Sequence, residues 1–182
     1  MTAPTALELC GKAQLGDAAR AVLTPTMTPQ EYLSALLDGE HFSDAVKFLA
    51  HALPKREAVG WACLCAREVT GPDTPALAVQ ALEAAERWVH EPSEEHRRAA
   101  MAAAEASGLD SPGACAAFGA FVSDGSLAPP DVPAVPPADH LTAHAVGGAV
   151  TLAAVMSEPE KAPEKYRRFL DIGIGVAKGE PS

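Results

Sequence analysis

The chain has 182 residues, of which 48% are apolar and 21% charged, which is the composition of a globular protein rather than of a disordered chain. Its net charge of −10 repels a phosphate backbone, and its cationic groups, such as Arg97 and Arg98, have glutamates nearby and are interpreted as solvated helix faces, so we expect no nucleic-acid partner. The first residues lack a signal-peptide pattern and the longest apolar run, 145–156, is too short to cross a bilayer, which predicts a cytoplasmic protein without membrane insertion.

Helical periodicity recurs along the sequence, and no segment alternates convincingly as a strand would. We therefore expect an all-α fold, a single-domain bundle of roughly eight to nine helices. Segment 5–23 is interpreted as two short helices separated at Gly16. Thr28 and Glu31 form a capping box with a proline at the first helical position, which predicts a helix that ends at Gly39.

Segment 41–53 has the clearest amphipathic pattern, because its apolar residues recur at the spacing of one helical face. Pro54 then interrupts the chain and can begin the next helix at an angle. That helix, 54–69, is apolar on more than one face, so we expect it in the middle of the bundle. The stripe of segment 41–53 consists of Phe42, Ala45, Val46, Leu49, Ala50 and Leu53.

Three more helices are expected over 74–90, 92–107 and from Ser111 onward, and two further helices over 139–156 and 163–178. The stripe of small residues in 139–156 predicts very close helix packing there. That stripe consists of Ala143, Gly147 and Thr151, beside Gly148. The expected inner face of the same helix consists of Leu141, Ala145, Gly148, Ala149, Leu152 and Ala153.

These elements divide the domain 1–182 into a main bundle, 1–123, a proline-rich extended segment, 124–138, a C-terminal helical pair, 139–178, and a frayed tail, 179–182. The prolines exclude helix and sheet from the extended segment. Two roles remain open for it. We favour a brace laid across the helices over a ligand for a partner, although long irregular loops in compact domains are often functional.

His140 and His144 are the best metal candidate, because residues four apart share one helical face. The segment lacks the glutamate of the H-E-x-x-H pattern, and a third ligand would have to come from Asp139 or a distant carboxylate. The four cysteines show no disulfide framework, and we interpret them as buried thiols. We therefore predict no metal and no cofactor.

The tract from His51 to Trp61 is the most distinctive local feature, because it combines His51, Lys55, Arg56 and Glu57 with an indole at a helix–helix corner. Arginine and tryptophan are enriched in interaction hot spots, so the corner is a candidate partner-binding site. The alternative is a corner stabilised by charge pairing with Trp61 in the core. We hypothesise that Lys55 and Arg56 face solvent and bind a protein partner, while Trp61 is mainly structural.

Three strings, LAHALPKREAVGWACLCAR, WVHEPSEEHRRAAMAAAEASG and GSLAPPDVPAVPPADHLTAHAVGGAV, occur in this order. Together they resemble a small bacterial all-helical family of unknown function that is associated with type VI secretion gene clusters. The resemblance covers nearly the whole chain and contains no catalytic signature. One departure is Gly60, where the family pattern has a bulkier residue, and this predicts a gap near the corner.

From these features we expect a non-catalytic protein–protein interaction component, an accessory, adaptor or chaperone-like protein of a bacterial type VI-like secretion system. One alternative is an immunity-type protein that binds a toxin, which would require a concentrated acidic face. Another is a metal-dependent enzyme that uses His140 and His144. The sequence leaves open the identity of the protein partner, the surface that binds it and the oligomeric state.

Overall fold

The structure, a computed structural model, describes residues 5–179, and this range contains ten α-helices, one 3-10 helix and no strand. The all-α single domain and the two short helices of the first unit are confirmed, and the number of helices in this range exceeds the roughly eight to nine expected. Of the predicted frayed tail, 180–182 lie outside the described residues. The helices are α1 (Ala6–Ala13), α2 (Asp17–Ala21), α3 (Pro29–Asp38), α4 (Phe42–Ala52), α5 (Lys55–Glu68), α6 (Ala76–His90), α7 (Glu94–Ser107), α8 (Pro112–Phe121), α9 (Leu141–Val155), η1 (Pro159–Lys161) and α10 (Ala162–Lys178).

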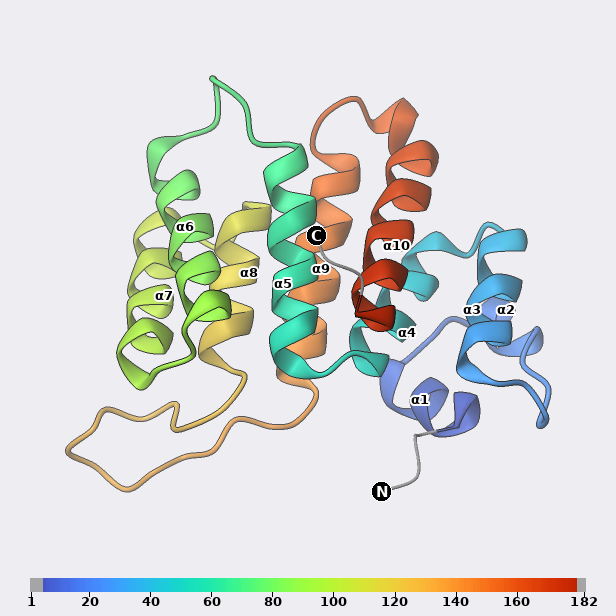
Figure 1. Cartoon of the computed structure of the whole chain (residues 1–182), viewed down its shortest axis with the longest axis horizontal. Coiled ribbons are helices and arrows are strands. Elements are labelled where there is room, and N and C mark those ends of the chain that lie inside the picture. Colours follow the sequence, from blue (N-terminus) through green and yellow to red (C-terminus); the bar gives the residue numbers. More distant parts are fainter. Residues whose placement is uncertain (1–4, 180–182) are drawn as a thin grey trace.

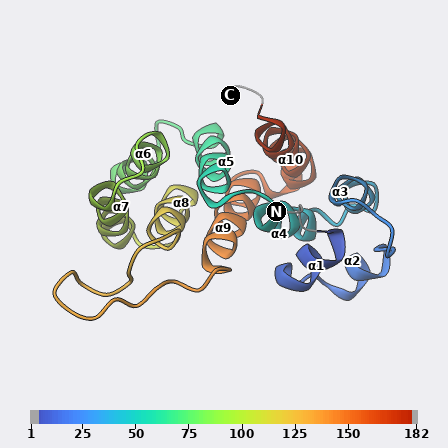
Figure 2. The same ribbon diagram turned by 60° about the horizontal axis from the view of Figure 1, so that its bottom comes forward.

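Helices α5 and α9 lie side by side at the centre of the molecule (Figures 1 and 2). On one side they contact α8, which packs with α6 and α7. On the other side lie α4 and α10, and α4 in turn contacts α1 and α3. The central place predicted for the helix that begins at the Pro54 corner is therefore confirmed.

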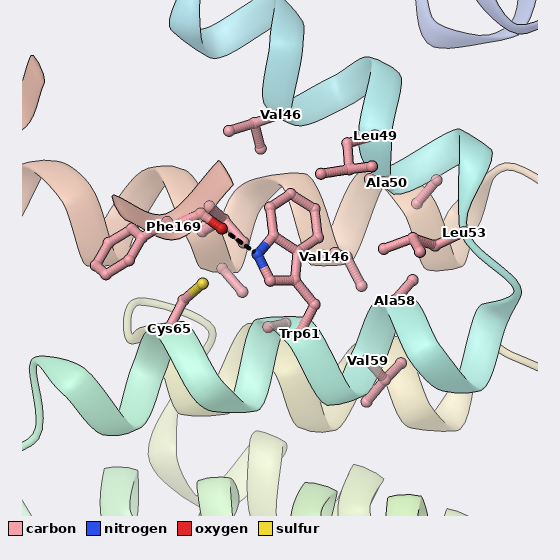
Figure 3. Packing of buried hydrophobic residues seen from close by; sticks show 14 of the residues in the cluster. Val46, Leu49, Ala50, Leu53, Ala58, Val59, Trp61, Cys65, Val146 and Phe169 are labelled. Carbon is pink, nitrogen blue, oxygen red and sulfur yellow. Dashed lines mark hydrogen bonds between the residues drawn. The ribbon is translucent and has the colours of Figure 1, made fainter. Parts of the chain in front are cut away.

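Buried hydrophobic side chains of α4, α5 and α10 meet in the core (Figure 3). Every residue of the stripe predicted for α4 is buried. Trp61 of α5 has no exposed surface, and its indole Nε1–H donates to the Phe169 carbonyl of α10 at 2.7 Å. This hydrogen bond satisfies the polar group of a buried indole and connects two helices that are distant in the sequence.

Helix α9 departs from the prediction. Four of the six residues assigned to its inner face are only partly buried, namely Leu141, Ala145, Gly148 and Leu152. Helix α9 contacts α4, α5, α8 and α10, so it is buried over a broad arc. Its small and apolar residues occur on all sides, and the sequence therefore does not show which face of the helix is buried. The buried residues are Thr142, Ala143, Val146, Gly147, Ala149, Val150, Ala153 and Ala154.

The close packing predicted for the small residues of α9 is also wrong, because a Cβ atom at Gly147 or Gly148 would have no neighbour within 4 Å. Close approach occurs instead at Gly113 of α8, where a Cβ atom would lie 2.7 Å from the Ala78 carbonyl oxygen of α6. Within the described range, no helix is both long and apolar enough to cross a membrane.

Candidate functional site

The partner-binding residues proposed for the corner occupy different environments. Trp61 belongs to the core. Arg56 extends along the surface to the end of α6, where Nε donates to the Val89 carbonyl at 2.7 Å and Nη2 to the His90 carbonyl at 3.1 Å. A helix leaves its last carbonyls without partners, so Arg56 stabilises the C-terminus of α6.

The gap predicted beside Gly60 is present as a hollow of about 460 Å³, which Arg56 and Glu57 also line. Lys55 points elsewhere, and its ammonium lies 3.6 Å from the carboxylate of Asp139, just before α9. The corner is therefore not one continuous surface. Lys55 and His51 face one side of it, and Arg56 and Glu57 face another.

The structure brings His51 to the histidine pair of α9. The ring centroid of His51 lies 5.7 Å from that of His144, and the rings of His140 and His144 are 4.9 Å apart. Two features that looked unrelated in the sequence therefore form one cluster of three imidazoles. Sequence reasoning missed this cluster, because its members are far apart along the chain.

The three histidines line a groove between α1, α4 and α9, which we call the histidine groove. It consists of two hollows of about 410 Å³ and 430 Å³ that share Gln14, His51 and Ala143. The ionisable residues that line it are Lys12, Lys47, His51, Lys55, Asp139, His140 and His144.

The electrostatics of the histidine groove disfavour protonated imidazoles. Burial and the positive fields of His144, His140 and Lys12 lower the pKa of His51 to about 4. Burial, followed by His140 and Lys47, also lowers the pKa of His144. Near neutral pH these two imidazoles are therefore uncharged.

The metal-dependent alternative gains no support from this geometry. Between residues 5 and 179, no group of three or more histidine, cysteine, aspartate or glutamate side chains converges as metal ligands would. Of the cysteines, Cys10, Cys63 and Cys65 are buried and Cys115 is partly buried.

A second feature is the connection between α8 and α9. Residues 129–136, which we call the arm, are all exposed, and this segment projects away from the helices (Figures 1 and 2). Over residues 129–136 the segment therefore does not form the brace expected for 124–138, because a brace laid across helices would be covered on one side.

The arm begins at a tightly built neck, residues 125–128. Arg97 of α7, taken from the sequence as part of a solvated face, is only 2% exposed. Its guanidinium donates to both carboxylate oxygens of Glu94, at 2.6 and 2.9 Å, to the Phe121 carbonyl at 2.5 Å and to the Ser126 carbonyl at 2.9 Å. It also lies 4.7 Å above the Phe121 ring. Arg97 thus connects α7 and the end of α8 to the neck.

Other contacts fix the two ends of the arm. Ser126 Oγ accepts hydrogen bonds from the backbone N–H groups of Ala128 and Val135, and the Leu127 N–H donates to the Val135 carbonyl at 2.8 Å. Gly125 adopts φ +68°, and a Cβ atom there would lie 3.0 Å from the Arg97 guanidinium. Glycine is therefore required by both conformation and space.

The fold and these features define the chain as a single all-α domain with a cationic groove and a projecting arm. Residues 32–177 match the family of unknown function DUF6931, and the chain belongs to this family. Comparisons with curated proteins and with solved structures found no match. The family description contains no reference to secretion.

Proposed function

We propose that this protein is a non-catalytic protein–protein interaction component, an accessory or adaptor protein that binds its partner through the arm. The observation that carries the proposal is the combination of an exposed, proline-rich arm with a neck built around a buried arginine. The placement in a bacterial type VI-like secretion system rests on the sequence resemblance alone.

The neck supports an interaction role because it is costly to build. Burying a guanidinium carries a desolvation penalty of about several kcal/mol unless every donor is engaged. Arg97 comes close to that condition, because four hydrogen bonds to Glu94 and two backbone carbonyls give each of its three guanidinium nitrogens a partner. A simple connection between antiparallel helices needs only about 2–8 residues. The extra length and the buried arginine are explained if the arm must be held in a fixed place for a partner.

The arm has the composition of a polyproline II ligand. Between Pro133 and Ala138 the chain forms no helix, strand or turn. Polyproline II has three residues per turn, so a partner that binds the arm in this conformation would find Val132 and Val135 on one edge and Pro133 and Pro136 on the next. The two valines are 47% and 51% exposed. Two Val-Pro steps at this spacing suit the aromatic-lined grooves that bind proline-rich segments.

The charge of the arm limits the partner further. Asp131 is the one charged residue between 125 and 138 in the sequence. The partner groove should therefore combine aromatic side chains with a cation, rather than with the acidic residues that suit basic proline-rich ligands. Lys55 of the corner remains a proposed second contact, since its ammonium lies beside the exit of the arm at Asp139.

The proposal is tested by site-specific cross-linking. A photoreactive residue in place of Ala134, expressed in the native host, should form an adduct with one protein, and the linked peptide should lie among aromatic residues of that protein. The double variant Val132→Asp with Val135→Asp should lose the adduct.

A matched control is Leu109→Asp, which places the same charge on another exposed apolar residue, 50% exposed and outside the arm. It should keep the adduct. If no adduct forms, or if the adduct survives the double substitution in the arm, the arm is not the partner-binding element.

A further inference from the structure

The histidine groove is unusual in its charge. The chain as a whole carries −10, yet the described residues that line this groove include three lysines and three histidines against one carboxylate, that of Asp139. That carboxylate already lies 3.6 Å from Lys55. Lys47 is 3.5 Å from Asp44, which does not line the groove. Near neutral pH the positive charge of the groove therefore comes from its lysines, which outnumber its one carboxylate, and such a local cationic region on an acidic protein raises the local concentration of anions.

The charged groups converge from four segments. Lys12 comes from the last turn of α1, Lys47 and His51 from α4, and Lys55 from the start of α5. The fourth segment, the start of α9 with the residues just before it, contributes Asp139, His140 and His144. Apart from Asp139, none of these groove-lining groups can balance a protonated imidazole.

His51 is incompletely satisfied. Its Nε2 atom is buried and has no hydrogen-bond partner among the described residues. A buried polar atom without a partner costs about 1–3 kcal/mol. The ring of His51 meets that of His144 in an edge-to-face arrangement with centroids 5.7 Å apart, and both residues line the same hollow.

The floor of the groove leaves room for a ligand. It is formed by the small residues Ala143, Gly147 and Gly148, and a Cβ atom at either glycine would have no neighbour within 4 Å. Thr151 and Gln14 add neutral hydrogen-bonding groups to the wall. The small residues of α9 thus keep this space open instead of allowing a second helix to approach.

We propose that the histidine groove binds the anionic group of a ligand, a carboxylate or a phosphate, between its lysines and its cluster of imidazoles, and that binding is coupled to proton uptake by the imidazoles. An anion supplies the negative charge that the cluster lacks and can accept a hydrogen bond from a protonated ring. Each bound proton in turn strengthens anion binding, by reciprocity of linkage. The proposal does not depend on the function proposed for the arm.

The test is an NMR titration of the histidine rings in the whole protein at constant ionic strength. Two probes distinguish the source of the anion: inorganic phosphate stands for a free anion, and a tetraglutamate peptide stands for an acidic protein segment. The ring signals of His51 and His144 should shift saturably with at least one probe. Between pH 7.5 and pH 5.5 the affinity should rise by about tenfold, as expected when binding takes up about half a proton on average over this range.

Substitutions show where the anion binds. Lys12→Met with Lys47→Met removes two cations whose side chains are solvent-accessible and should weaken binding by about tenfold while the spectrum stays that of the folded protein. Lys178→Gln, at the exposed end of α10, removes one cation away from the groove and should leave the affinity unchanged.

Saturation by phosphate alone supports a site for a small anion, and tighter binding of tetraglutamate supports a site for an acidic segment. The proposal is overturned if neither probe shifts the groove histidines. It is also overturned if His41 and His96, which lie outside the groove, shift equally, or if the lysine substitutions change nothing.

Discussion

Substitution of Gly173 by alanine should destabilise the protein strongly, although alanine is the better helix former. A Cβ atom at this position of α10 would lie 2.7 Å from both Cδ2 of Leu49 and Cε2 of Trp61, whereas ordinary contact begins at 3.4 Å. The indole cannot move away freely, because its Nε1–H is bonded to the Phe169 carbonyl at 2.7 Å. Helix α10 can pack here only because residue 173 has no side chain.

The expected magnitude follows from three contributions. Overpacking a buried site costs about 1–3 kcal/mol. Weakening the hydrogen bond of the indole adds about 1 kcal/mol. The higher helix propensity of alanine stabilises the folded state by about 1 kcal/mol and offsets part of this loss. The free energy of unfolding should therefore fall by about 2 kcal/mol, which for a chain of this length corresponds to a fall in Tm of about 4–8 °C.

The matched control is Gly148→Ala in α9, where the added methyl group meets no atom within 4 Å. This variant should be stabilised by up to about 1 kcal/mol, because only the propensity contribution remains. Thermal and urea unfolding of both variants test the reasoning. Equal stability of the two variants, or a Gly173→Ala protein as stable as the parent, would refute the packing described for α10.

Three further predictions concern the neck, the histidine groove and metals. Arg97→Met should lower the free energy of unfolding by about 2–3 kcal/mol and make the arm more sensitive to proteolysis, because the Phe121 carbonyl loses its side-chain donor and the Ser126 carbonyl keeps only the longer bond from Arg98. The pKa of His51 is about 4 in the folded state against an ordinary 6.5, so the unfolded chain binds this proton first and stability falls as pH decreases from 6.5 to 4. The free energy of unfolding should fall by about 1–2 kcal/mol over this range, after allowance for the partial exposure of the ring. Urea unfolding at pH 7.5 and pH 4.5 measures this difference, which should be smaller in His51→Gln than in the parent. Chelators should leave Tm unchanged, and a stoichiometric metal whose removal lowers Tm would instead revive the role of His140 and His144 as ligands.

Where local rules govern the chain, the sequence was sufficient to predict the fold. The capping box of α3 is present, with the Glu31 N–H donating to Thr28 Oγ at 3.2 Å and the Thr28 N–H donating to the Glu31 carboxylate at 2.8 Å. The stripe of α4 is buried as predicted, because one apolar face alternates with a polar one. Both signals are contained within a few residues.

The sequence was insufficient where tertiary contacts decide. The buried face of α9 could not be predicted, because small and apolar residues occur all round the helix. Arg97 and Arg98 look alike in the sequence, yet Arg97 is buried beneath the neck while Arg98 donates to Glu94 and Ala128 from the surface. The meeting of His51 with His144 depends on how α4 packs against α9.

The central claim is that the arm binds a partner and does not brace the fold. Its most direct test is to replace residues 129–134 by a glycine–serine segment of the same length. The measurement is the amount of cross-linked partner per folded protein in the native host, with the photoreactive residue moved to position 136 in both the parent and the variant. We predict that the replacement abolishes the adduct while Tm changes by less than about 2 °C, since all six residues are exposed and, within the described part of the chain, their one hydrogen bond is the local turn from the Val132 N–H to the Pro129 carbonyl. Retention of the adduct, or a large fall in Tm, would contradict the account.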